Sequence, residues 1–192
     1  MDGSGALIQD MIRFSALGYQ RGLIVGTGGN VSCRCPEGVC ITASGTCLGD
    51  MDAEDILLVN LSGCVMQGAA GKRPSIETSF HIAVYQVRPD VSCVYHTHAT
   101  YCTYWALQKK ELPMVTSVAR MLLGSVPRVG YSEPGTLELA ERVHDTLTEY
   151  PGIKAFLLAG HGAVALGSSP EDAFYTAELL EQTAKLAYML EQ

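Results

Sequence analysis

Three histidines in two separate apolar segments place the strongest constraint on this 192-residue chain. His96 and His98 lie one residue apart in VYHTHA, and His161 lies between two glycines after the apolar run IKAFLLA. Residues i and i+2 of a β-strand point to the same face, so we expect His96 and His98 to lie side by side. Glycines on both sides of His161 allow a backbone turn and the close approach of a ligand. The sequence therefore predicts one site built from two distant strands.

Three neutral imidazoles with an open position are typical of a catalytic zinc site rather than a structural one. We expect Glu77, in RPSIETSFH, in the first turn of a helix before the histidine strand, where it can be a fourth ligand or a base. The alternatives are unrelated core histidines and a helix N-terminal acid that favours the macrodipole. We interpret His81 as a packed or surface histidine, with support of the metal site from behind as the alternative.

Charge and cysteine content narrow the functional class. The net charge is −7 and no stretch is rich in Lys or Arg, which excludes nucleic acid as the main partner. Only 17% of the residues are charged, which indicates that part of the surface is buried in an oligomer. Seven cysteines, an odd number, do not fit a secreted disulfide framework, and we expect neither a signal peptide nor a membrane span. These features favour a reducing cytoplasm. Cys33, Cys35 and Cys40 could bind a metal, but we interpret them as small residues along a hairpin.

Hydrophobic periodicity and turn residues predict alternating helices and strands. Helices are expected at residues 5–22, 75–88, 99–108, 135–150 and 170–191, and strands within 26–35, 38–43, 56–59, 91–99, 153–160 and 163–167. Ser75 is the expected N-cap of the second helix, and 114–122 and 126–131 are expected to be short strands or connectors. This order predicts a single α/β domain over residues 1–192 with a mixed sheet.

Three turns rich in amides and hydroxyls are candidates for a phosphate site. GTGGN at 26–30 enters a strand, unlike the Walker and dinucleotide loops, which enter a helix. ITASGT at 41–46 and the helix start at Ser75 supply further hydroxyl groups. Such turns can surround a phosphate, and ordinary hairpin turns are the alternative.

The order of these motifs resembles the class II aldolase/adducin family. The motifs are GGNVSCR, ITASG, RPSIET, YHTHATYCT and LLAGHGAVALG, and the resemblance covers residues 5–190. Within the family the chain is most similar to fuculose-phosphate-type aldolases.

The resemblance implies a three-layer α/β/α fold with a central, mostly antiparallel sheet, and a homotetramer with active sites at subunit interfaces. It implies Zn²⁺ or another divalent ion on His96, His98 and His161, with Glu77 as ligand or base. It implies a substrate phosphate held by the glycine-rich and hydroxyl-rich turns. The phosphate-binding positions carried over are Gly29, Asn30, Ser44, Gly45 and Ser75.

The implied activity is a metal-dependent lyase that cleaves a phosphorylated ketose to dihydroxyacetone phosphate and an aldehyde through a zinc-stabilised enediolate, with Glu77 as the proton shuttle. The alternatives are a decarboxylase or 4-epimerase of a sugar phosphate, and a non-enzymatic assembly module of the adducin kind. Relatives often have two serines before the glutamate, whereas this chain has Ser75-Ile76. The segment LPMVTSVARMLLG lacks the tyrosine that such aldolases use. Arg120 there could bind an acidic substrate group or form an interface or surface ion pair, and we favour the ion pair.

Overall fold

The computed structural model describes residues 3–191 and builds them around one eight-stranded sheet. The strand order is β4-β3-β2-β1-β5-β8-β7-β6; β6 and β7 are parallel, and the other neighbouring pairs are antiparallel. The strands are β1 (Asn30–Cys35), β2 (Gly38–Thr42), β3 (Ile56–Val59), β4 (Val65–Gln67), β5 (Cys93–Thr97), β6 (Arg128–Val129), β7 (Ala155–Leu158) and β8 (Gly162–Gly167). The predicted mixed, mostly antiparallel sheet is confirmed.

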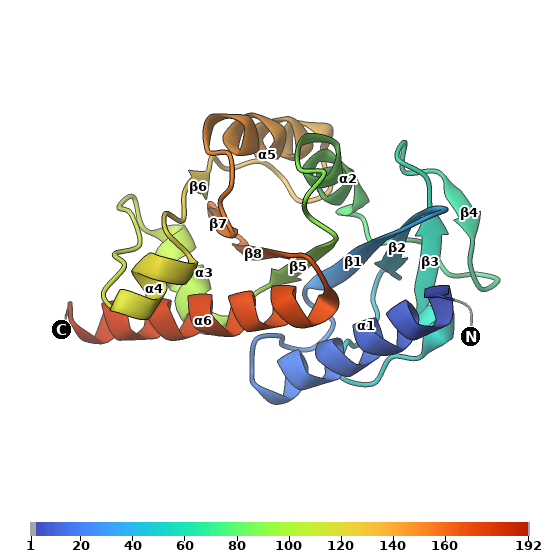
Figure 1. Cartoon of the computed structure of the whole chain (residues 1–192), viewed down its shortest axis with the longest axis horizontal. Coiled ribbons are helices and arrows are strands. Elements are labelled where there is room, and N and C mark those ends of the chain that lie inside the picture. Colours follow the sequence, from blue (N-terminus) through green and yellow to red (C-terminus); the bar gives the residue numbers. More distant parts are fainter. Residues whose placement is uncertain (1–2, 192) are drawn as a thin grey trace.

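Helices cover both faces of the sheet, as the three-layer prediction requires (Figure 1). The helices are α1 (Gly3–Gln20), η1 (Ala53–Asp55), α2 (Thr78–Val87), α3 (Thr100–Leu107), α4 (Ser117–Leu122), α5 (Leu137–Glu149) and α6 (Pro170–Met189). In Figure 1, α1 and α6 lie below the sheet, and α2 and α5 lie above it. Among residues 3–191, no helix combines the length and apolar character that crossing a bilayer needs.

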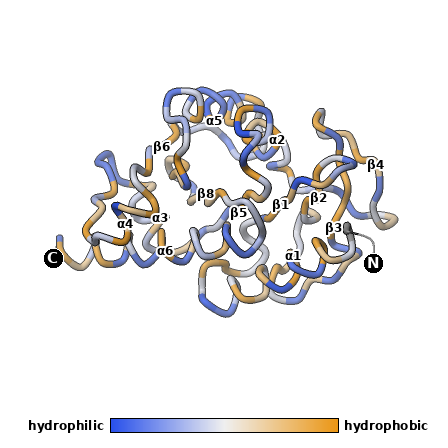
Figure 2. The backbone as a smooth tube through the Cα atoms, viewed as in Figure 1, coloured by the Kyte–Doolittle hydropathy of each residue, from blue (hydrophilic) through white to orange (hydrophobic). Residues whose placement is uncertain are grey.

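Two apolar cores, one on each face, fix the position of the central strand β5. Tyr95 packs with Phe14 and Phe174 in the core between the sheet and helices α1 and α6. Val94 belongs to the core between the sheet and helices α2 and α5. Because side chains alternate along a strand, His96 shares the face of Val94 and therefore points toward α2. The hydrophobic strand β8 accordingly runs through the middle of the molecule, whereas α5 and α6 carry mixed colours along their length (Figure 2).

Two predicted local structures are wrong. The second helix begins at Thr78 rather than at Ser75, with Glu77 as its N-cap residue. The cause is a long-range pairing: Pro74 forms a bridge with Ala43, and the Ser75 amide donates to the Thr42 carbonyl, which keeps these residues extended.

The segment expected as a strand or connector at 114–122 contains the short helix α4. Thr116 is its N-cap, and the Thr116 hydroxyl accepts a hydrogen bond from the Ala119 amide at 3.1 Å. Of the residues in this helix, only Ala119 is buried, so the apolar pattern of the segment does not reflect a strand in the sheet.

Candidate metal centre

The three histidines lie together, although they come from two separate parts of the chain. His96 lies in β5, His98 directly follows that strand, and His161 lies in the turn between β7 and β8. The ring centroids are 4.8 Å apart for His96–His98, 4.7 Å for His96–His161 and 4.9 Å for His98–His161. One potential ligand atom from each of the three residues lies within 4.8 Å of the other two.

The nitrogen chemistry of these rings fits a divalent cation. His96 Nδ1 donates to the Ala163 carbonyl at 3.0 Å, which leaves the Nε2 lone pair free. That Nε2 lies 3.0 Å from Nε2 of His98. Burial, together with His96, lowers the pKa of His98 to about 4 and holds the pKa of His161 below its usual value. Three imidazole rings that direct nitrogen atoms at one another match the donor set of a zinc site.

Glu77 completes the cluster from the N-terminus of α2. Its Oε2 lies 3.2 Å from Nε2 of His96, and its Oε1 lies 3.5 Å from Nε2 of His161. Burial raises the pKa of the Glu77 carboxyl, but interactions with His96, His161 and Asn30 outweigh burial and lower this pKa to about 2. The buried Oε1 has no hydrogen-bond partner among the described residues. Glu77 is therefore an ionised carboxylate with one oxygen free to act as ligand or base.

Two glycines make room for the histidine rings. A Cβ at Gly162 would lie 2.4 Å from the Thr97 carbonyl oxygen and 2.9 Å from Cδ2 of His98. A Cβ at Gly28 would lie 2.9 Å from Nδ1 of His98. Gly160 adopts a φ of +68°, which the turn before His161 requires. The glycines around His161 thus serve the turn and the packing of the rings against each other.

The turns expected to hold phosphate meet around Thr42. The Thr42 hydroxyl accepts from the Val31 amide at 3.2 Å, and the Thr42 carbonyl accepts from the Ser75 amide at 3.1 Å. The Ser44 amide donates to the Arg73 carbonyl, and Gly45 beside it is exposed, with no heavy atom within 4 Å of the position that a Cβ would take. The structure therefore brings the turns that contain Gly29, Asn30, Ser44, Gly45 and Ser75 close together.

The candidate phosphate-binding residues differ in whether their polar groups already form hydrogen bonds within the protein. The Ser75 hydroxyl accepts from the Glu77 amide at 3.2 Å. Gly29 has a φ of +76°, and a Cβ there would lie 2.6 Å from the His96 carbonyl oxygen. The Asn30 side chain points to Glu77 rather than outward, and its Nδ2 donates to Oε2 at 2.8 Å.

Sequence reasoning missed a set of polar residues behind Glu77. His81, interpreted as a packed or surface residue, is fully buried and hydrogen-bonded to both Asn30 and Ser32. Ser32 also contacts the hydroxyl of Tyr85 at 2.8 Å. The available signal was spacing: the sequence has N-x-S in a predicted strand and E-x3-H-x3-Y in a predicted helix.

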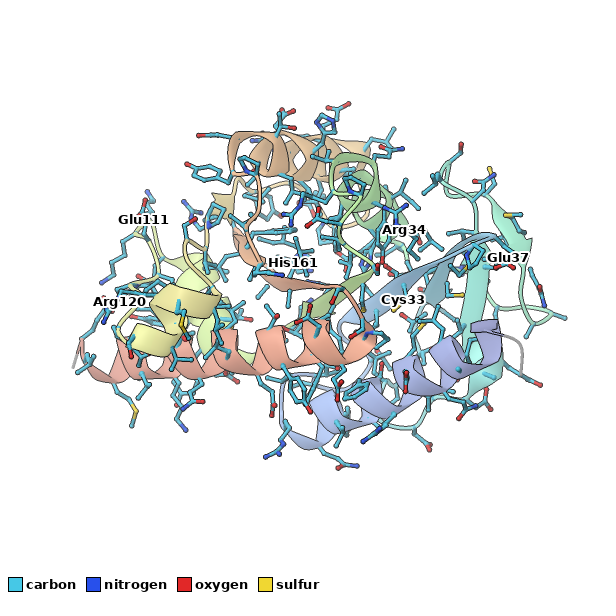
Figure 3. All side chains as sticks on the ribbon, in the orientation of Figure 1. Cys33, Arg34, Glu37, Glu111, Arg120 and His161 are labelled. Atoms are coloured by element: carbon cyan, nitrogen blue, oxygen red, sulfur yellow. The ribbon has the colours of Figure 1, made fainter. Side chains whose placement is uncertain are left out.

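Arg120 lies away from the histidines of its own chain. Figure 3 shows it on α4, well separated from His161. Its guanidinium donates to the Met114 carbonyl at 2.7 Å and makes no ion pair within residues 3–191. Arg120 therefore forms no surface ion pair within the described chain, and an ion pair at a subunit interface stays a prediction.

The cysteines of the first hairpin are free thiols. Cys33 and Cys40 pair across β1 and β2, and Cys33 Sγ lies 3.1 Å from Cys93 Sγ. Burial raises the pKa of the Cys33 thiol well above its usual value. Within the described residues, no group containing these cysteines meets the geometry of a metal site, which supports the hairpin interpretation.

Comparison with known proteins agrees with this arrangement. Residues 9–188 match the family described as "Class II Aldolase and Adducin N-terminal domain". The chain is 34% identical to an L-fuculose phosphate aldolase of Methanococcus maripaludis, over 95% of this chain and 97% of that protein. It is 36% identical to a 3-oxo-tetronate 4-phosphate decarboxylase of Pectobacterium atrosepticum, over 94% of this chain and 83% of that protein.

A solved structure of a related protein has the same fold. The crystal structure of YgbL, a putative aldolase/epimerase/decarboxylase from Escherichia coli, superposes with a TM-score of 0.87 at 33% identity. The superposition covers 96% of this chain and 89% of that chain. The chain therefore belongs to the class II aldolase and adducin family and is an enzyme of the class II aldolase type.

Proposed function

We propose that this enzyme is a metal-dependent aldolase that cleaves a phosphorylated ketose to dihydroxyacetone phosphate and an aldehyde. The observation that carries the proposal is the convergence of His96, His98 and His161 on one point beside the free oxygen of Glu77. Similarity to an L-fuculose phosphate aldolase over nearly the full length supports the same reaction class. His96, His98 and His161 hold the cation, and Glu77 is the proton-transfer residue with access to it.

The histidines and Glu77 have different parts in the proposed reaction: the histidines hold the cation, and Glu77 transfers the proton. A divalent cation on the three histidines supplies positive charge opposite the oxygen that becomes negative in the reaction. In the direction of bond formation, the ionised Glu77 takes a proton from the carbon next to the substrate carbonyl. In the direction of cleavage, the ionised Glu77 takes the hydroxyl proton of the departing half as the C–O bond of that half becomes C=O, and Glu77 then gives this proton to the carbon that receives the electron pair.

A decarboxylase acting on a phosphorylated oxo acid is the second candidate, favoured by the 3-oxo-tetronate 4-phosphate decarboxylase of Pectobacterium atrosepticum. Loss of CO2 from such a four-carbon acid leaves the same three-carbon phosphate, with the electron pair on the same carbon. A cation held by the histidines would serve both reactions. Glu77 would relay the proton, which comes from the departing hydroxyl group in aldol cleavage and from water in decarboxylation. The two functions therefore differ in the leaving group rather than in the catalytic cluster.

The proposal extends to substrate phosphate, assembly and location. The turns that meet at Thr42 hold the phosphate, with the Gly45 region open to solvent. Val118, Met121 and Leu122 on α4 are exposed apolar residues, which supports a homotetramer that buries them and places active sites at its interfaces. The seven free cysteines fit a reducing cytoplasm.

The test is a product assay with zinc-loaded protein on two substrates. L-fuculose 1-phosphate should give equal amounts of dihydroxyacetone phosphate and aldehyde, with no CO2. 3-Oxo-tetronate 4-phosphate should not be turned over at a comparable rate. Release of CO2 with the second substrate and no reaction with the first would assign the decarboxylase function instead. No reaction with either would refute both.

A further inference from the structure

A line of five buried polar groups runs from the metal centre between β1 and α2. Asn30 Nδ2 donates to Glu77 Oε2 at 2.8 Å, and Asn30 Oδ1 lies 2.5 Å from Nε2 of His81. His81 Nδ1 lies 2.7 Å from the Ser32 hydroxyl, which lies 2.8 Å from the Tyr85 hydroxyl. All five residues are at most 6% exposed. The line is therefore closed to bulk water along its length.

The spacing of the residues explains how this line forms. Asn30 and Ser32 are two apart on β1 and share one face of the strand. Glu77, His81 and Tyr85 are four apart at the start of and along α2 and share one face of the helix. The strand face and the helix face meet, so the polar groups alternate between the two elements.

The direction of every hydrogen bond in the line follows from the orientation of the Asn30 amide. Its NH2 group donates to Glu77, so its oxygen faces His81 and accepts a hydrogen bond there. His81 must then carry its proton on Nε2, which leaves Nδ1 as an acceptor. Ser32 uses its one hydroxyl hydrogen on Nδ1, so Tyr85 must donate to Ser32. Each group has one permitted orientation.

We propose that Asn30, His81, Ser32 and Tyr85 are positioning residues that hold Glu77 by Oε2 and present Oε1 as the oxygen that exchanges the substrate proton. This rests on the proposed role of Glu77 as the proton-transfer residue. Oε1 is the buried oxygen without a hydrogen-bond partner among the described residues, and it faces His161 at 3.5 Å from its Nε2. The Asn30 side chain accordingly serves Glu77 rather than the substrate phosphate.

The first test is spectroscopic and needs no turnover. In zinc-loaded wild-type protein labelled with ¹⁵N-histidine, long-range ¹H–¹⁵N correlation spectra report the tautomer of each ring. His81→Gln assigns the His81 signals by their loss. The proposal requires a neutral His81 ring with its proton on Nε2. A ring protonated on Nδ1, or on both nitrogens, would overturn the chain of donors.

The second test compares two amides at position 81. The glutamine of His81→Gln places its amide near the site of Nε2 and can still donate to Asn30. The shorter asparagine of His81→Asn places its amide near Nδ1 and reaches Ser32 but not Asn30. Both variants bury an amide in the same space, so they are matched for the cost of burial.

We expect His81→Asn to lower kcat about 10- to 100-fold, with KM and zinc content unchanged. His81→Gln should lose at most about fivefold, the effect of one neutral hydrogen bond. Equal losses in the two variants, or a change confined to KM, would overturn the positioning role. If His81→Asn does not fold, the tautomer of His81 in the wild-type protein still tests the proposal. A wild-type protein without turnover overturns the proposed function, whereas an active wild type with a proton on Nδ1 of His81 overturns only this inference.

Discussion

Oε2 of Glu77 lies 3.2 Å from Nε2 of His96, so the N-terminus of α2 meets the central strand β5 at a potential metal-binding nitrogen. The contact joins the carboxylate to the imidazole cluster, although the two residues lie in different elements. Mutations can distinguish the two residues, because Glu77 is proposed to move a proton and His96 to hold the cation.

The first prediction concerns Glu77→Gln. The amide keeps the size of the side chain but cannot take up a proton, so turnover should fall by about 10²- to 10⁴-fold while zinc remains bound. Initial rates and metal analysis of the same preparation provide the measurement. Glu141→Gln, an exposed change on α5, is the matched control and should behave as wild type. Turnover of Glu77→Gln within about twofold of wild type would remove its proton-transfer role.

The second prediction concerns the imidazoles. His96→Ala and His161→Ala should each lose zinc and turnover together, because two remaining histidines do not complete the donor set of a zinc site. Metal analysis after dialysis measures the first quantity, and circular dichroism checks that the fold is retained. His144→Ala removes an exposed histidine on α5 and serves as the control. Zinc retained at full stoichiometry in both site variants would contradict the proposed ligand set.

The third prediction concerns Gly162→Ala. The added Cβ would lie 2.4 Å from the Thr97 carbonyl oxygen and 2.9 Å from the His98 ring, so β5 and β8 must separate. We expect a loss of about 1–3 kcal/mol in the free energy of unfolding and weaker zinc binding. Urea denaturation and a zinc titration measure the two effects. Gly5→Ala, with no heavy atom within 4 Å of the new Cβ, should leave both unchanged or raise stability. Equal stability in the two variants would argue against close packing at Gly162.

The fourth prediction concerns the pH dependence of the Arg88–Asp90 pair. The Arg88 guanidinium donates to both Asp90 oxygens, at 2.8 and 2.7 Å, and holds the pKa of Asp90 below its usual value. A lowered folded-state pKa means that the pair stabilises the fold above the unfolded-state pKa of about 3.9 and loses this effect as pH falls through the folded-state value.

Asp90→Asn should therefore cost about 0.5–1 kcal/mol at pH 7, a figure reduced for the exposure of the carboxylate, and much less at pH 3. Urea denaturation at the two pH values provides the measurement. Asp10→Asn, which removes an exposed carboxylate without an ion pair among the described residues, should show no such dependence. A cost for Asp90→Asn that is equal at both pH values would show that the charge of Asp90 is not the cause.

Local pattern predicted most of the strands and the pairing of His96 with His98 because both depend on short spacings, whereas the mostly antiparallel sheet and the meeting of His161 with this pair were implied by the family resemblance. The alternation in VYHTHA places His96 and His98 together, and the glycines around His161 indicate a turn. The start of α2 could not be predicted, because it depends on the bridge between Pro74 and Ala43, residues far apart in sequence. Thr116 was a visible N-cap, but the apolar residues after it favoured a strand.

The polar line behind Glu77 shows the same limit of local pattern. Each half of it is a regular spacing within one element, yet nothing in the sequence says that the Asn30 face of β1 meets the His81 face of α2. That pairing is set by the packing of the helix on the sheet. The assignments of Gly29, Asn30, Ser44, Gly45 and Ser75 to phosphate binding remain predictions, with the Asn30 side chain now directed elsewhere.

His161 stands in the hairpin turn between β7 and β8, and His96 is hydrogen-bonded to Ala163 in the same hairpin. A cation shared by these rings would fasten the hairpin to the middle of the sheet. The order of the turn should then depend on occupancy. Removal of the metal by a chelator should speed amide hydrogen exchange at residues 159–163 more than in α1 or α6. Bound metal would then stabilise the turn against local opening more than it stabilises the whole domain against unfolding.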